Sequence, residues 1–231
     1  TRFVLEQYGF EPKTLDNKTV RAGGLNTLFD VVVLPDVTKE VIATGKPKRD
    51  EGAMGYFPEL PPEYAGGLDK EGATALRDFV ERGGTLVALS SSTEYVIGEL
   101  ALPVRNGAAR AEGFAIAGSI LRAEVAPGHP VTDGLPAEVA VFQDEALAFD
   151  TVLPGPEMER RVLASYPAAP NDILLSGWMR GPEAIARKAA AVALTYGKGK
   201  VVLLGFRAQH RAQTPATYPF LFGALYWSTA N

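Results

Sequence analysis

The chain has 231 residues, of which 46% are hydrophobic and 22% charged, and its formal net charge is −4. This composition is typical of a globular protein with a sizeable core, and the interspersed charges lack the basic surface of a nucleic-acid-binding protein. The absence of cysteine excludes disulfides, thiolate metal ligands and thiol catalysis. No apolar run reaches about 18 residues, so the sequence predicts no membrane-spanning helix.

The first predicted element is a helix over residues 1–8, with Val4, Leu5 and Tyr8 on one face. The apolar run over residues 30–36 ends in Pro-Asp, and such a run predicts a strand buried on both faces. Because doubly wound domains usually open on a strand, we expect a further strand ahead of the first helix.

A long loop is expected over residues 45–69, which contain four prolines and several glycines. Loops of this length are uncommon and are often functional. Its aromatic residues either contact a partner or pack back onto the domain. These aromatic residues are Tyr56, Phe57 and Tyr64.

A helix is expected next, starting with Asp69 as its N-cap and ending at Gly83-Gly84. A strand over residues 85–89 and a second helix follow it. This order is typical of a βαβ unit in a parallel sheet. The sequence therefore predicts an α/β fold, a flavodoxin-like three-layer sandwich with a mainly parallel sheet.

The second half is predicted to be rich in short strands separated by Pro and Gly. We interpret the chain as one domain, with a core over residues 1–118 and 190–231 and an antiparallel β extension over about residues 119–189. The expected strands of the second half cover residues 119–125, 139–149, 161–166, 172–178, 190–196 and 200–206. The last two form a hairpin, and an apolar helix ends the chain.

Three serines follow the strand over residues 85–89, at a strand-to-helix turn where a nucleophile would lie beside helix amides. Ser90 and Ser91 are the candidate nucleophiles, with His210 as the base. However, Ser91 to Glu94 also reads S-x-x-E, a capping box that would give the Ser91 hydroxyl a structural role. The Gly-x-Ser-x-Gly pattern is missing, and we favour capping over catalysis.

The loop after the last predicted strand concentrates polar side chains where open α/β sheets gather ligand-binding groups. A structural network and a binding pocket both remain open for it. The candidate binding residues in this loop are Arg207, Gln209, His210, Arg211 and Gln213.

No metal site is predicted, because the two histidines, His129 and His210, are far apart and neither stands in an H-x-x-E or H-E-x-x-H pattern. Of four further carboxylates, one stands at a predicted strand end, one at a predicted helix start and two inside a predicted strand, and the sequence selects no acid–base pair among them. These carboxylates are Asp36, Glu94, Asp144 and Glu145.

Three phrases occur together in this sequence: a helix–strand unit over residues 67–87, a His-Pro turn over residues 129–136, and the Gly-Lys-Gly hairpin strand followed by the last helix. Together they resemble class I glutamine amidotransferase-like domains. The usual chemistry of that fold needs a thiolate at the turn after the central strand. This chain has serines at that turn.

Four narrower phrases cover residues 1–10, 61–67, 175–178 and 205–214. They are similar to the C-terminal domain of large bacterial zinc carboxypeptidases of the carboxypeptidase A-like class, over essentially the whole chain. Trp178, in the third phrase, joins the candidate binding residues. The resemblance implies a preceding peptidase domain in the same polypeptide, zinc in that domain only, and a periplasmic or secreted protein.

The leading functional hypothesis is a non-catalytic accessory or binding domain of a zinc metallocarboxypeptidase, without a cofactor of its own. Its partner would be the preceding peptidase domain, and a homo-oligomer is left open. One alternative is a serine-dependent hydrolase that uses Ser90 or Ser91 with His210. A second alternative is a small-molecule or sugar-binding module.

Overall fold

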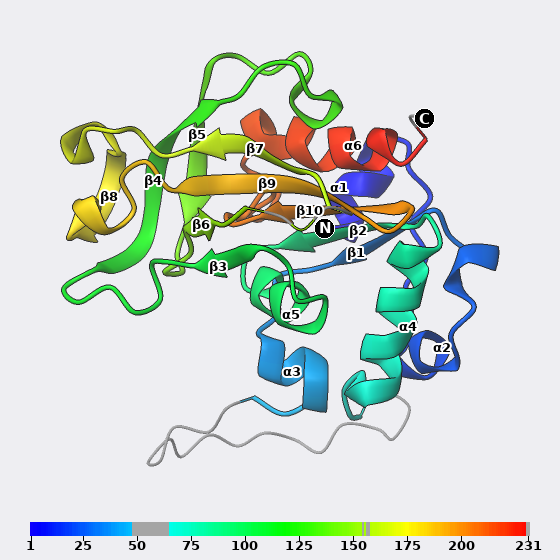
Figure 1. Ribbon diagram of the computed structural model, residues 1–231. Coiled ribbons are helices and arrows are strands. Elements are labelled where there is room, and N and C mark those ends of the chain that lie inside the picture. The colour runs from blue at the N-terminus through cyan, green and yellow to red at the C-terminus, as the bar shows by residue number, and fades with distance from the viewer. Residues whose placement is uncertain (48–64, 154, 156–157, 230–231) are drawn as a thin grey trace.

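The computed structural model describes residues 1–47, 65–153, 155 and 158–229 (Figure 1). Its α-helices are α1 (Arg2–Gln7), α2 (Asn17–Ala22), α3 (Lys39–Thr44), α4 (Asp69–Glu81), α5 (Ser92–Glu99) and α6 (Tyr218–Trp227). Its strands are β1 (Val31–Leu34), β2 (Thr85–Leu89), β3 (Val104–Asn106), β4 (Ala115–Val125), β5 (Glu138–Gln143), β6 (Phe149–Thr151), β7 (Arg160–Ser165), β8 (Leu174–Arg180), β9 (Ala189–Tyr196) and β10 (Gly199–Leu204).

The ten strands form one mixed sheet, in the order β1-β2-β10-β9-β7-β4-β5, with β8 paired to β4 and the β3–β6 pair joined to β9. Among the described strands, only the β1–β2 and β2–β10 pairings are parallel, and every other pairing is antiparallel. The α/β fold is as predicted, but the expectation of a mainly parallel sheet is wrong. The hairpin partner β9 reverses direction immediately beside the parallel strands, so the long antiparallel part continues the same sheet.

Helices cover both faces of the parallel strands, with α1 and α6 on one face and α2, α3, α4 and α5 on the other (Figure 1). Side chains of a strand alternate between the faces, and β2 shows the result. Val87 and Leu89 belong to the core beneath α1 and α6, while Leu86 and Ala88 belong to the core beneath α4 and α5. Both sets are buried, so β2 is a central strand whose carboxyl end is held rigidly.

Most predicted elements lie within a few residues of their observed bounds, and the strand over residues 85–89 and the 190–206 hairpin are confirmed. The strand expected over residues 139–149 is divided, because β5 ends at Gln143 and β6 begins at Phe149. The cap of α4 is Leu68, and Asp69 instead pairs with Arg21. Most of the 45–69 loop, including its three aromatic residues, lies outside the described residues.

Among the helices that the structure describes, none has the length and apolar character needed to cross a membrane.

Candidate functional site

Ser90 stands directly after β2 and has a left-handed backbone, with φ of 51°. An L-residue with a side chain adopts this conformation at a cost, and such strain is typical of tight strand-to-helix turns at functional sites. The Ser90 amide donates to the carbonyl oxygen of Leu204 on β10 at 2.8 Å. Its side chain is fully buried, and its Oγ has no hydrogen-bond partner among the described residues. The sharp turn is present, but its hydroxyl is engaged by no base.

Ser91 has a different role from the predicted one. It is the N-cap of α5, but its side chain makes no capping hydrogen bond, so the expected capping box is wrong. Its backbone amide donates to Asp36 Oδ1 at 3.1 Å. The neighbouring Ser92 hydroxyl ties the turn together by donating to the carbonyl oxygen of Leu34 at 3.1 Å and accepting from the amide of Leu89 at 2.9 Å. The structural hydroxyl of the turn is therefore that of Ser92.

Arg207 joins the ends of two strands. Its guanidinium pairs with Asp36, which follows β1, and with Asp144, which follows β5, at 2.8 Å each. Its backbone amide donates to the carbonyl oxygen of Phe142 at 3.1 Å, which fixes the start of the loop after β10. Burial acts to lower the pKa of Arg207, but the hydrogen bond with Asp144 and the nearby carboxylates outweigh it and raise the pKa above its ordinary value.

Two further carboxylates lie near this bridge. Glu94, in the first turn of α5, accepts a hydrogen bond from Asn106 Nδ2 at 3.0 Å. The pKa of Glu145 is raised, first by burial and then by the negative charges of Asp144, Asp36 and Glu94, with Arg207 opposing the shift. The edge where β1, β2 and β10 end therefore carries more negative than positive charge.

Because the pKa of Glu145 is raised, replacing its carboxylate by a neutral side chain is expected to increase the free energy of unfolding by an amount that depends on pH. The folded state holds this proton more tightly than the unfolded chain, so Glu145 costs stability once the pH rises above the ordinary pKa of 4.5. Glu145→Gln is expected to raise the free energy of unfolding at pH 7 by about 0.3 kcal/mol, a small value because the carboxylate is only partly buried and solvent screens its charge. No gain is expected at about pH 3.5.

Urea denaturation at the two pH values would measure this difference, with Glu124→Gln, an exposed carboxylate on β4 outside the cluster, as the matched control. An equal gain at both pH values would show that the charge of Glu145 is not its cause.

The structure does not assemble the proposed serine–histidine pair. The ring of His210 stacks on that of Phe142, with ring centres 4.1 Å apart and planes 21° apart. No hydrogen bond joins His210 to Ser90 or Ser91 within the described part of the chain. The other histidine, His129, accepts from the amide of Val131 and packs against Trp227, so it serves a turn elsewhere in the fold.

The other candidate binding residues lie in two places: three are in the loop after β10, and one is on β8. Gln209 Nε2 donates to Thr1 Oγ1 at 3.2 Å, while Arg211 and Gln213 are exposed. Trp178 is 53% exposed on β8, which among the described strands pairs with β4 alone and is not part of the parallel edge. Within the loop after β10, Arg207 is therefore held by ion pairs, whereas Arg211 and Gln213 are exposed.

The described residues hold no group of three or more His, Cys, Asp or Glu side chains placed to bind a metal ion.

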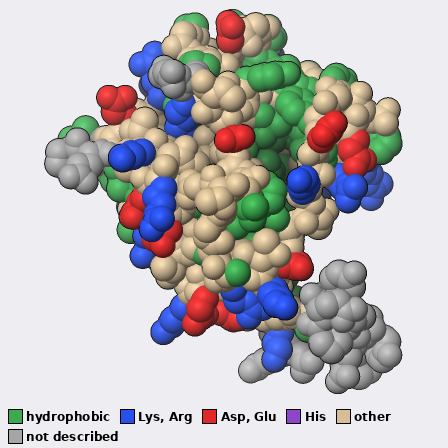
Figure 2. All heavy atoms as spheres, turned by 90° about the vertical axis from the view of Figure 1, so that its right-hand side faces the viewer, with side chains coloured by type: hydrophobic (Ala, Val, Ile, Leu, Met, Phe, Trp, Pro, Cys, Tyr) green, Lys and Arg blue, Asp and Glu red, His purple; other side chains and the backbone are tan. Residues whose placement is uncertain are grey.

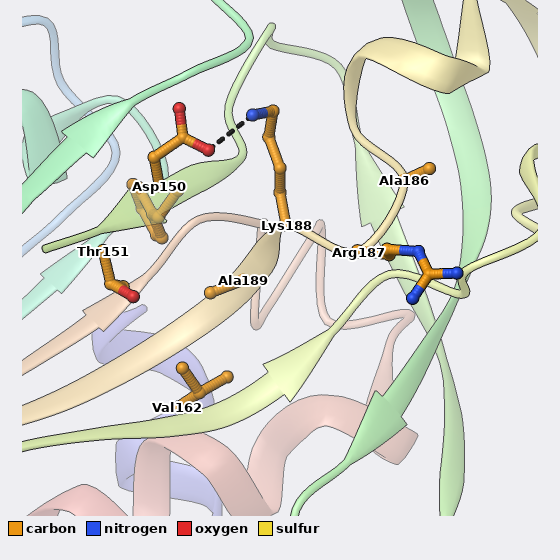
Figure 3. Close-up of a pocket in the computed structure, with 8 residues that line it drawn as sticks. Asp150, Thr151, Val162, Ala186, Arg187, Lys188 and Ala189 are labelled. Atoms are coloured by element: carbon orange, nitrogen blue, oxygen red, sulfur yellow. Dashed lines mark hydrogen bonds and ion pairs between the residues drawn. The ribbon is translucent and has the colours of Figure 1, made fainter.

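A small cavity of about 240 Å³ lies away from this edge, beside β6, β7 and the start of β9 (Figure 3). Lys188 points toward Asp150, and the Nζ–Oδ1 distance is 2.5 Å. Asp150 also pairs with Arg105 at 3.3 Å. Lys188 and Asp150 thus neutralise each other within the lining, which also includes the exposed Arg187.

The sequence pointed to these residues one by one but did not show how they pair. Asp36, Asp144 and Arg207 were all noted, yet only the fold shows that one guanidinium bridges both carboxylates. No sequence pattern pointed to Asn106 as a residue of the site. It lies in β3, and its side chain also donates to the carbonyl oxygen of Ala146 and accepts from the amide of Ala108.

Comparison with known proteins yields matches in structure alone: no protein-family model matches the chain, and no curated protein matches its sequence. Cytoplasmic protein STM3548 from Salmonella typhimurium is similar with a TM-score of 0.55 and 14% identity, over 96% of this chain and 83% of that one. A "putative gmp synthase subunit a protein" from Thermoplasma acidophilum is similar with a TM-score of 0.55 and 10% identity, over 97% and 86%.

A glutamine amidotransferase from Thermotoga maritima also matches, with a TM-score of 0.49 and 15% identity, over 100% of this chain and 79% of that one. At these identities the two matches with a TM-score of 0.55 show a shared fold alone.

Proposed function

We propose that this chain is a non-catalytic accessory or binding domain that keeps an amidotransferase-like fold without its covalent chemistry. The observation that carries the proposal is the hydrogen bond from the Ser91 amide to Asp36. In enzymes with a nucleophile at such a turn, the amide of the following residue helps to stabilise the oxyanion. Here a carboxylate already accepts from that amide.

The charge of the site also supports the proposal. Asp36, Asp144 and Glu145 surround a single Arg207, and their negative field opposes both an alkoxide at Ser90 and an oxyanion beside it. Catalytic sites for acyl transfer have the opposite polarity, with donors aimed at the developing negative charge.

The purified chain is therefore expected to release no ammonia from glutamine and to resist labelling by a fluorophosphonate. Ser90→Cys, which places a thiol at the turn, is expected to remain inactive, because neither a base nor an oxyanion donor accompanies it. The informative control combines Ser90→Cys with Asp36→Ala, which removes the acceptor from the Ser91 amide, and it is also expected to be inactive because no base is added. Glutamine turnover by the unaltered chain, or serine labelling that Ser90→Ala removes, would overturn the proposal.

The narrower part of the proposal is that this domain follows the peptidase domain of a zinc metallocarboxypeptidase in the same polypeptide. It rests on the four sequence phrases that resemble such proteins. Reading the complete gene tests it directly. A zinc peptidase sequence upstream in the same reading frame is expected, and a reading frame without one would remove this part and leave the rest standing.

The two alternatives have less support from the geometry. A serine hydrolase needs His210 to leave Phe142 and reach a serine that is fully buried. A small anionic ligand or sugar would have to compete with Asp36 and Asp144 for Arg207. For contacts with a partner, the exposed Leu175 and Trp178 of β8 offer apolar surface.

A further inference from the structure

β1 is an edge strand whose sequence is unusual for that position. This strand pairs with β2 alone among the described strands, so its other side lacks a neighbour. Natural edge strands are usually protected by Pro, Lys or a bulge. β1 reads Val-Val-Val-Leu, which is the sequence of a strand paired on both sides.

The backbone groups of the open side can be assigned. The amide of Thr85 on β2 donates to the carbonyl oxygen of Asp30 at 2.9 Å. Because successive residues of a strand turn their backbone groups to opposite sides, Val32 also faces β2. Val31 and Val33 therefore direct their amides and carbonyls to the open side.

A slot of about 950 Å³ lies along this edge. Its lining includes β1 itself, Leu5 of α1, Val20 of α2 and Leu225 of α6. Residues 10–15 also line it, and they form neither helix nor strand in the structure. Apart from the Phe10 amide, which donates to Leu5, the described structure shows no backbone hydrogen bond for these residues. Two segments with unpaired backbone thus border one apolar space.

The charges of the slot indicate what it accepts. β1 contributes none. Two basic and two acidic residues line the slot, all with exposed side chains, so their charges balance: Arg2, Lys13, Glu11 and Asp30. Figure 2 shows the side of the molecule with α2, α4 and the end of α6, where apolar side chains lie between scattered acidic and basic ones. An occupant with uncharged side chains and no net charge matches this lining.

We propose that the slot binds a single extended apolar segment of polypeptide from outside residues 1–231, which adds to the sheet as a strand parallel to β1. Main-chain hydrogen bonds with Val31 and Val33 would hold it, and its side chains would enter the two cores beside β1. A second copy of the chain fits poorly, because helices line the slot around β1 and the same helices would accompany the β1 of the copy.

The geometry also fixes how the segment can be tethered. Thr1 lines the slot and accepts from Gln209, in the loop after the carboxyl end of β10. A strand parallel to β1 would end on that same side of the sheet. A segment of about six valine, isoleucine and threonine residues, joined to Thr1 through a short Gly-Ser linker, can therefore reach the slot at high effective concentration.

This fusion protein is expected to melt about 5 °C or more above the chain alone and to slow hydrogen exchange of the Val33 amide at least about tenfold. The Val32 amide, which faces β2, serves as the internal reference. Val33→Pro removes the amide on the open side, where an edge strand tolerates proline, and is expected to abolish both gains. Val33→Thr keeps the amide and is expected to keep both gains.

The control fusion carries a Gly-Ser segment of equal length. The proposal fails if this control raises the melting temperature equally, if Val33→Pro keeps the gain, or if the Val33 amide still exchanges rapidly in the fusion protein. A dimer of the chain alone with a protected Val33 amide would show that a second copy occupies the slot, and would also overturn it.

Discussion

Arg207→Met is expected to lower the free energy of unfolding by about 2 to 3 kcal/mol at neutral pH. The substitution leaves Asp36 and Asp144 without their shared cation, and both are mostly buried, with side-chain exposures of 19% and 24%. It also removes a link between the ends of β1, β5 and β10. The loss should be smaller than for a fully buried ion pair, because the arginine side chain is 31% exposed.

Arg105→Met is the matched control. Arg105 also pairs with an aspartate, but its side chain is 74% exposed and Asp150 keeps Lys188 as a partner. Its expected cost is about 0.5 kcal/mol or less. Arg207→Lys keeps the charge but lacks the fork that contacts both carboxylates, so an intermediate loss is expected.

The triple variant Arg207→Met, Asp36→Asn and Asp144→Asn should recover part of the loss, since it removes the unpaired charges together with the cation. Urea denaturation measures all four proteins. Equal losses for Arg207→Met and Arg105→Met would contradict the assignment of Arg207 as the bridge between the strand ends.

The sequence was most informative where one pattern determines one element. Five buried residues between Gly84 and Ser90 predict β2 without knowledge of the rest of the chain. The Gly-Lys-Gly hairpin between β9 and β10 is equally local. The mixed sheet was not predictable in the same way, because the pairing of β7 with β9 and of β4 with β8 depends on contacts between distant segments.

The hydrogen bonds of the site were not predictable for the same reason, because they join distant segments. Ser91 and Glu94 fit a capping box by spacing alone, but the fold brings Asp36 to the Ser91 amide and Asn106 to Glu94. Both partners come from elements that the local pattern does not include. The polar loop after β10 was located correctly, while the pairing of Arg207 with residues 36 and 144 required the order of the strands.

Substitutions at Ser90 are expected to rank by their tolerance of a left-handed backbone, with glycine above alanine and valine far below both. The φ of 51° costs about 1 to 2 kcal/mol for a residue with a Cβ atom, so Ser90→Gly should be about 1 kcal/mol more stable than Ser90→Ala. Both variants remove the same unpartnered hydroxyl, and their difference therefore isolates the backbone. Ser90→Val adds a branched side chain to a fully buried position and should lose about 3 kcal/mol.

Thr93 provides the comparison that separates this strain from a general effect of glycine. It is equally buried, lies in α5 and donates its hydroxyl to the carbonyl oxygen of Ser90 at 2.7 Å. At this helical position alanine should be more stable than glycine by about 1 kcal/mol, the reverse of the order at Ser90. Thermal and urea unfolding of the four variants measure both orders. The same order at both positions would mean that the turn after β2 is unstrained.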